Sequence, residues 1–132
     1  MIRCKRAYEA AAADDGYRVL VDRLWPRGVR KTALVMDEWL KALAPSTELR
    51  ERFHHDPGLF EAFRQAYEAE LAAHPENWWG LLDRARQGTL TLLYGAKDTE
   101  HNNARVLAEF LEEELERQQP GTSPVCYLDK PE

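Results

Sequence analysis

The chain has little cysteine: Cys4 and Cys126 are its two thiols in 132 residues. Thiols this far apart in the sequence indicate neither a disulfide framework nor a zinc site, so we expect ordinary structural residues. The sequence also has no apolar run close to the roughly 20 residues that cross a bilayer. Its N-terminus lacks the apolar core of a signal peptide. We therefore expect a cytoplasmic protein without a membrane partner.

Several motifs of known enzyme classes are missing as well. The sequence contains no Walker lysine loop and no Gly-x-Gly-x-x-Gly. Gly95 and Ala96 stand where a thiol enzyme of the rhodanese or phosphatase type carries its cysteine, which disfavours a covalent thiol mechanism. The run 54–56 (HHD) is a poor metal site, because neighbouring helical side chains point about 100° apart. We predict no metal site and assign no cofactor.

The net charge of −5 hides an uneven distribution. Residues 1–31 hold eight basic and four acidic side chains, a local charge of +4, and the rest of the chain carries −9. Binding to duplex nucleic acid needs an extended positive surface, which this chain does not offer. The basic segment is better suited to a small anion, which we take as the expected ligand.

The sequence does contain strands that alternate with helices. The run 89–94 (TLTLLY) is uncharged and predicts a strand buried on both faces. Apolar patterning predicts further strands at 2–7 and 17–22, and helices at 35–43, 46–53, 57–74, 78–87 and from about 100 onward. The fold class is therefore α/β, a small and mainly parallel sheet of three or four strands surrounded by about five helices. We expect a single domain at 1–119 and a C-terminal tail at 120–132, in which 125–128 could pair as an edge strand.

Two polar loops follow the strands at 17–22 and 89–94. In a parallel sheet both loops leave the same edge, where open α/β sheets place ligand sites, so their side chains converge if the strands are neighbours. Carboxylates and histidine suit general acid–base catalysis, and arginine and lysine suit the binding of an anion. The predicted catalytic residues are Asp22, Asp98 and His101. The predicted ligand-binding residues are Arg23, Trp25, Arg27, Lys97, Asn102 and Asn103.

Each of these candidates also has an ordinary structural explanation. Asp22 could pair with an arginine, Asp98 could cap the last helix, and Trp25 could cover the core. The basic side chains could form a solvated surface, and the asparagines could make local hydrogen bonds. His101, one helical turn after Asp98, could be an ordinary exposed histidine. The convergence of two such loops is what favours the functional interpretation.

Three spaced segments resemble the domain of unknown function 488 family, in its short YeaO-like branch. They are 22–28 (DRLWPRG), 39–46 (WLKALAPS) and 94–104 (YGAKDTEHNNA). The resemblance covers the chain to about residue 117 and implies a small cytoplasmic α/β domain of bacteria or archaea, without implying an activity. Longer members often carry cysteine and a Cys-His-Arg run near the second loop, where this chain has Tyr94 and Asn102-Asn103. That departure argues against a thiol-based role.

Two functions remain open at this point. The first is an enzyme, such as a hydrolase that uses water, acting on a small phosphorylated or nucleotide-like substrate in the cleft between the two loops. The alternative is a non-catalytic module that binds a small ligand or a partner through the same basic cleft.

Overall fold

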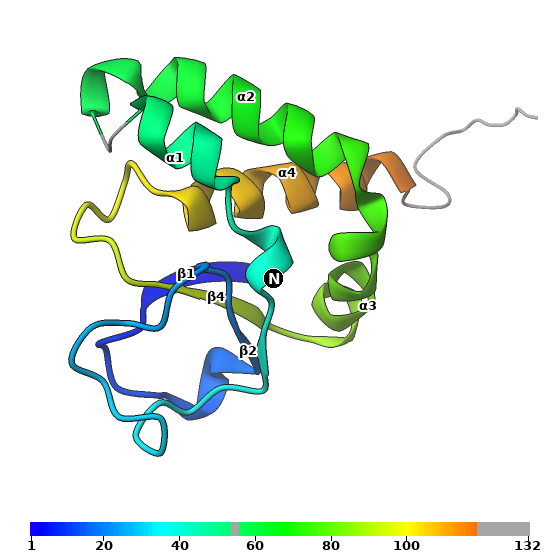
Figure 1. Cartoon of the computed structure of the whole chain (residues 1–132). Helices are drawn as coiled ribbons and strands as arrows, with labels where there is room; N and C mark the ends of the chain where they lie inside the picture. Colours follow the sequence, from blue (N-terminus) through cyan, green and yellow to red (C-terminus); the bar gives the residue numbers. More distant parts are fainter. Residues whose placement is uncertain (54–55, 119–132) are drawn as a thin grey trace, which may run out of the picture.

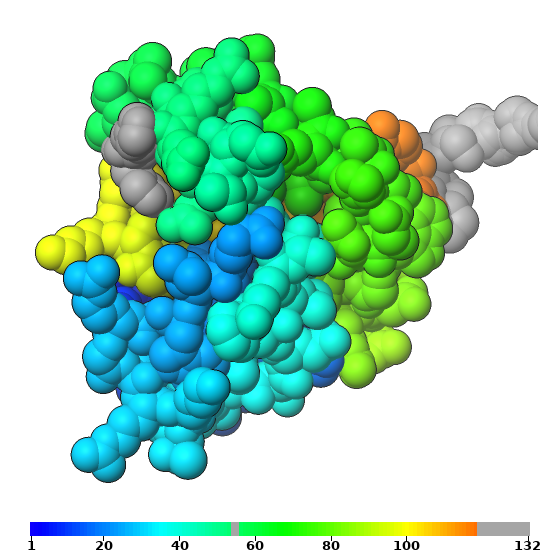
Figure 2. Space-filling model, viewed as in Figure 1, coloured from blue at the N-terminus to red at the C-terminus, as the bar shows by residue number. Residues whose placement is uncertain are grey.

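Four parallel strands form the sheet of the computed structural model, which describes residues 1–53 and 56–118 (Figure 1). The strands are β1 (Ile2–Arg6), β2 (Tyr17–Leu20), β3 (Glu38–Trp39) and β4 (Leu90–Tyr94), in the spatial order β1-β4-β2-β3. Every strand pair is parallel, which confirms the predicted fold class. Because β2 and β4 are neighbours, the segments that follow them leave the same edge, and Figure 2 shows these blue and yellow segments side by side.

Strand β4 is buried on both faces, as its uncharged sequence predicts. Leu92 packs with Val19 in the larger hydrophobic cluster, on the side of the helices. Leu93, one residue later, points to the opposite face and packs with Leu20 and Leu34. This alternation follows from the two-residue period of a strand.

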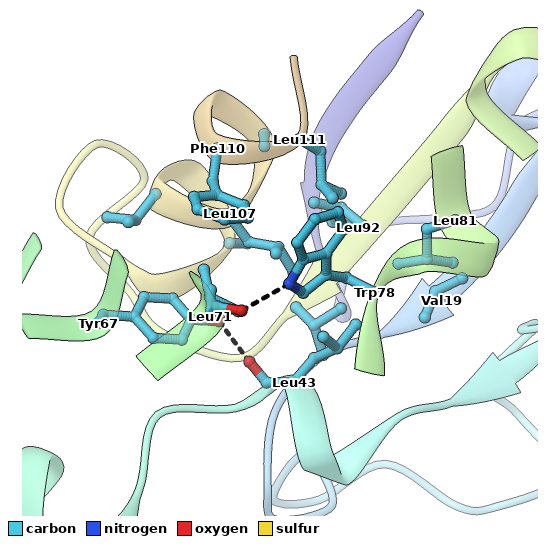
Figure 3. Packing of buried hydrophobic residues seen from close by; sticks show 14 of the residues in the cluster. Val19, Leu43, Tyr67, Leu71, Trp78, Leu81, Leu92, Leu107, Phe110 and Leu111 are labelled. Carbon is cyan, nitrogen blue, oxygen red and sulfur yellow. Dashed lines mark hydrogen bonds between the residues drawn. The ribbon is translucent and has the colours of Figure 1, made fainter. Parts of the chain in front are cut away.

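Four α-helices accompany the sheet: α1 (Thr47–Phe53), α2 (Phe60–Ala73), α3 (Trp79–Gln87) and α4 (Asn103–Gln118). Helices α1, α2 and α4 lie on one side of the sheet, and the segments after β1 and β2 run along the other (Figure 1). Two buried side chains connect segments of the helical layer by hydrogen bonds to backbone carbonyls (Figure 3). The Tyr67 hydroxyl donates to the Leu43 carbonyl, and Trp78 Nε1 donates to the Leu71 carbonyl at 2.7 Å.

The helix predicted at 35–43 is absent, and this prediction was wrong. The segment instead forms β3 and a short 3-10 turn at Lys41–Leu43. Its backbone is used for pairing with β2, since the Leu40 N–H donates to the Leu20 carbonyl at 2.9 Å. The loss of this helix explains why the sheet has four α-helices around it in the described part of the chain and not five.

A buried ion cluster joins β1 to the start of β2. Asp15 is fully buried and accepts hydrogen bonds from Lys5, Arg18, Arg3 and the Ala12 N–H. Burial alone would raise the pKa of Asp15, but the bonds from Ala12, Lys5 and Arg18 outweigh this effect and lower it to about 2. Part of the basic N-terminal segment is therefore used to hold the sheet together.

No helix in the described ranges has both the length and the apolar character needed to cross a membrane. The predicted tail at 120–132, the edge strand considered at 125–128 and Cys126 lie outside the described residues. The boundary at residue 119 therefore stays a prediction.

Candidate functional site

A pocket of about 230 Å³ lies where the loops after β2 and β4 meet helix α1 and the start of α2. Figure 2 shows this region, with the yellow segment after β4 next to the blue segment after β2 and the green helices above them. The pocket lies at the carboxyl ends of two parallel strands, where the sequence predicts a ligand site. Its lining comprises Asp22, Arg23, Leu24, Ala44, Pro45, Arg50, Phe53, Asp56, Pro57, Phe60, Phe63, Ala96, His101, Asn102 and Asn103.

Asp22 holds the two loops together. Its Oδ2 accepts from the Gly95 N–H at 2.8 Å, and its Oδ1 accepts from Asn103 Nδ2 at 3.1 Å. Asn103 Nδ2 also lies 3.3 Å from the Val21 carbonyl oxygen. The two loops therefore converge as predicted. In this arrangement Asp22 and Asn103 act as a link between the end of β2 and the start of α4.

The loop after β4 is held from its other side by β1. Arg6 Nε donates to the Ala96 carbonyl at 2.9 Å, and Arg6 Nη2 donates to the Gly95 carbonyl at 3.3 Å. A Cβ at Gly95 would lie 3.3 Å from Asp22 Oδ2, which is a tight contact. Gly95 therefore lets the backbone approach the carboxylate closely enough for the N–H bond to form.

The cations of the pocket are Arg23 and Arg50. Arg23 comes from the loop after β2, and its Nε is buried without a hydrogen-bond partner among the described residues. Arg50 comes from α1, and its side chain makes no hydrogen bond or ion pair within residues 1–53 and 56–118. Arg50 was not among the site residues predicted from the sequence. Its one available signal is the i,i+3 spacing to Phe53, which puts both on one face of the helix.

An aromatic wall faces the pocket from α1 and α2. The Phe53 and Phe63 ring centroids lie 6.1 Å apart, and those of Phe60 and Phe63 lie 5.8 Å apart. The His101 ring packs edge-to-face on Phe60, with centroids 5.0 Å apart. The phenylalanines were also missed as site residues, because their helical spacing is that of an ordinary core.

Asp98 and His101 form a pair at the edge of the site. Asp98 Oδ1 accepts from the N–H groups of Glu100 and His101, and its Oδ2 lies 3.0 Å from His101 Nδ1. These backbone hydrogen bonds, assisted by the histidine, lower the pKa of Asp98. His101 lines the pocket, whereas Asp98 does not. The Asp98 carboxylate thus caps the turn that precedes α4.

Asn102 is the cap of α4. Its Oδ1 accepts from the Arg105 N–H at 2.9 Å, and its Nδ2 donates to the Asp98 carbonyl at 2.9 Å. Asn102 is 4% exposed, so both ends of its side-chain amide are used in this local structure. Capping explains why α4 begins at Asn103, later than the expected start near residue 100.

Three predicted ligand-binding residues do not line the pocket: Trp25, Arg27 and Lys97. Trp25 packs at the opposite face of the sheet against Trp39, with ring centroids 5.3 Å apart, and its Nε1 donates to the Val29 carbonyl. Arg27 and Lys97 are exposed. The loop turns away from the pocket after Leu24, and Gly28 takes a left-handed conformation with φ of 81°.

The described residues contain no group of three or more His, Cys, Asp and Glu side chains that could hold a metal ion. His54 and His55 lie outside the described residues. The thiol of Cys4 lies away from the pocket lining and donates to the Ala104 carbonyl at 3.3 Å, and its burial raises the pKa to about 11. This cysteine is therefore protonated at neutral pH and has a structural role.

Comparison with known proteins gives the family. The family model described as the inactive DUF488-N3 subclade matches residues 1–128. The chain belongs to the DUF488 family. It is 54% identical over 110 residues to the uncharacterized protein YeaO of Escherichia coli K12, covering 83% of this chain and 96% of YeaO. It is 40% identical over 113 residues to the uncharacterized protein Rv3073c of Mycobacterium tuberculosis H37Rv, covering 83% of this chain and 92% of that protein. No solved structure matches significantly.

Membership of the DUF488 family confirms the resemblance seen in the loop motifs. The motif residues of this chain divide into two groups by position. Asp22, Arg23, His101, Asn102 and Asn103 line the pocket. Among the other motif residues, Trp25 and Trp39 pack beneath the sheet, Tyr94 is buried in the core on the side of the helices, and Arg27 and Lys97 are exposed.

Proposed function

We propose that this chain is a non-catalytic binding module for a small organic anion, with the pocket beside α1 as its binding site. The observation that carries the proposal is a pair of arginines, Arg23 and Arg50, that line one pocket. The Nε of Arg23 is buried without an acceptor among the described residues, and the Arg50 side chain makes no hydrogen bond or ion pair there. A charged donor without an acceptor is unfavourable when it is shielded from water. Carboxylates and phosphates are the acceptors that arginine binds best.

The carboxylates of the site support binding over catalysis. Asp22 accepts N–H bonds with both oxygens, and Asp98 uses both of its oxygens in the turn before α4. N–H donors favour the ionised form of a carboxylate over the protonated one, so a carboxylate that receives them is a weaker proton acceptor. The description of the matching subclade as inactive agrees with this reasoning.

A hydrolase acting in the same pocket is the second candidate. It is favoured by His101, which lines the pocket while its Nδ1 faces Asp98 at 3.0 Å. A histidine oriented by a carboxylate presents its second nitrogen as a proton acceptor or donor. In this alternative His101 would activate a water molecule, and the arginines would hold the substrate.

Isothermal titration of the full chain with acetate, benzoate and inorganic phosphate tests the proposal. We expect saturable binding of at least one of these anions. Arg50→Gln should weaken that binding by about tenfold to a hundredfold, the value of one charged hydrogen bond. Arg86→Gln, which changes an exposed arginine on α3 outside the pocket lining, is the matched control and should leave the affinity unchanged. Absence of binding by all three anions would refute the proposal.

Product analysis separates the module from the hydrolase. Incubation with phosphate monoesters and carboxylic esters should yield no product from the wild-type chain. If product forms and His101→Gln abolishes its formation, the hydrolase replaces the binding module as the function of the pocket. As a working location for the module we propose the cytoplasm.

A further inference from the structure

We infer that the ligand of this pocket is a single-ring aromatic carboxylate. The inference rests on the proposed function and adds the chemical class of the ligand. Its starting point is the wall formed by Phe53, Phe60, Phe63 and His101, all of which line the pocket. Each ring of this wall lies within about 6 Å of another, so they form one continuous aromatic surface.

The aromatic wall excludes a bare inorganic anion as the best ligand. The face of a phenyl ring carries partial negative charge, so it repels an anionic group and attracts the positive edge of another ring. The charged end of the ligand therefore lies toward Arg23 and Arg50. Arg52 stands over the Phe53 ring at 5.5 Å and Arg64 over the Phe60 ring at 5.3 Å, so an uncharged body meets the ring surface that these two arginines leave open. Arg50 and Phe53 are three residues apart on α1, so a cation and an aromatic ring stand next to each other on one helix face.

The acidic residues of the pocket favour a single negative charge. Asp22 and Asp56 line the same pocket as the two arginines. Their two negative charges offset the two positive charges of the arginines, so the lining gives a phosphate dianion no net electrostatic advantage over a carboxylate monoanion. The dianion also loses more hydration on entering the pocket. A planar carboxylate also matches the two parallel N–H groups of a guanidinium.

The size of the pocket limits the ligand to about one ring. Its volume of about 230 Å³ lies below the roughly 300–1,000 Å³ of pockets that hold drug-sized molecules. A complete nucleotide would exceed this space. Ring edges of a planar body can meet the phenyl faces as Phe60 meets His101, whereas a saturated ring has no comparable edge.

Isothermal titration of the full chain with benzoate, cyclohexanecarboxylate, acetate, phenyl phosphate and inorganic phosphate tests the inference. Benzoate should bind at least about fivefold tighter than cyclohexanecarboxylate, the increment expected from aromatic pairing. It should also bind tighter than phenyl phosphate. Phe60→Leu should reduce the preference for benzoate over cyclohexanecarboxylate to less than about twofold. Leu59→Ala, a change at an exposed neighbour outside the pocket lining, should preserve it.

The outcomes separate this inference from the function on which it rests. Equal binding of benzoate and cyclohexanecarboxylate, or tighter binding of either phosphate, would overturn the aromatic carboxylate and leave an anion-binding module. No binding of any probe would overturn both. Phe63→Leu serves as a second variant of the wall, and thermal unfolding of each variant shows that it is folded. A wall variant that is folded and keeps the full preference for benzoate would also overturn the inference.

Discussion

Replacement of Asp22 by asparagine is the most direct test of how the site is assembled. The carboxylate accepts from the Gly95 N–H at 2.8 Å and from Asn103 Nδ2 at 3.1 Å. An asparagine keeps one acceptor oxygen and turns an NH2 group toward the other donor. The variant therefore loses one charged hydrogen bond and leaves one donor without an acceptor. Together these losses should lower the free energy of unfolding by about 2–4 kcal/mol.

Urea unfolding at neutral pH, followed by tryptophan fluorescence, measures this loss. Asp56→Asn is the matched control, because it removes a second carboxylate from the same pocket. Asp56 caps the short turn before α2 by accepting from the Gly58 N–H, and asparagine caps equally well, so the control should change stability by less than about 0.5 kcal/mol. Equal losses in the two variants would refute the assignment of Asp22 as a link, because charge alone would then explain both.

A double-mutant cycle with Asn103→Ala examines the same link from the other loop. If Asp22 and Asn103 stabilise each other, the two losses should not add, and the coupling free energy should be at least about 0.5 kcal/mol. Additive losses would mean that the pairing contributes nothing of its own.

Three further substitutions test contacts that stabilise the sheet and the helices around the site. Tyr67→Phe removes the buried hydroxyl that donates to the Leu43 carbonyl, leaves that carbonyl without this donor, and should cost about 1–3 kcal/mol in urea unfolding. Gly16→Ala should cost about 2–4 kcal/mol, because Gly16 has a φ of +66° and a Cβ there would lie 2.1 Å from the Thr89 carbonyl oxygen. Asp15 has a folded-state pKa of about 2, below its unfolded value, so its contribution is present above about pH 4 and is lost as the pH falls toward 2. Below about pH 4 the free energy of unfolding of the wild-type chain should therefore fall more steeply with decreasing pH than that of Asp15→Asn.

Each of these perturbations has a matched control in the chain. Tyr17→Phe removes a hydroxyl that donates to an exposed glutamate, and should cost less than Tyr67→Phe. Gly28→Ala has a positive φ but open space around the new Cβ, so it isolates the backbone cost. Asp14→Asn removes an exposed carboxylate next to the buried one. If a control variant loses as much free energy of unfolding as the variant it is compared with, the explanation given for that variant is contradicted. The same holds if Asp14→Asn reduces the dependence of stability on pH below about pH 4 as much as Asp15→Asn does.

The sheet was largely predictable from the sequence, because the sequence of its central strand β4 fits no other kind of element. The run 90–94 has no charge and no helical period, so it must lie inside a sheet, and the convergence of the loops follows once β2 is its neighbour. Strand β3 was not predictable. It pairs over two residues, and the apolar spacing of Val35, Trp39 and Leu43 imitates a helix that long-range pairing with β2 overrides.

The composition of the pocket was only half predictable, for a related reason. Asp22 and Arg23 directly follow a strand, so the chain direction fixes where they lie. Arg50 and Phe53 enter the pocket because α1 packs over the sheet edge, and nothing in a short amphipathic helix tells whether its apolar face meets a core or a cavity. Trp25 shows the opposite error, because its loop folds under the sheet after the first three residues.

The position of the pocket and the hydrogen bonds of its carboxylates bear on the choice between binding and catalysis in the proposed function. Open α/β folds place ligands at the carboxyl ends of their strands whether or not they catalyse a reaction, so the pocket alone carries no argument for an enzyme. Catalysis would require groups placed to transfer a proton to or from the substrate. Asp22 links two loops and Asp98 holds a turn, which leaves His101 as the pocket-lining residue of the described chain best suited to proton transfer. We therefore propose binding in preference to hydrolysis, because no serine, threonine, cysteine or lysine lines the pocket among the described residues, whereas two arginines stand beside an aromatic wall.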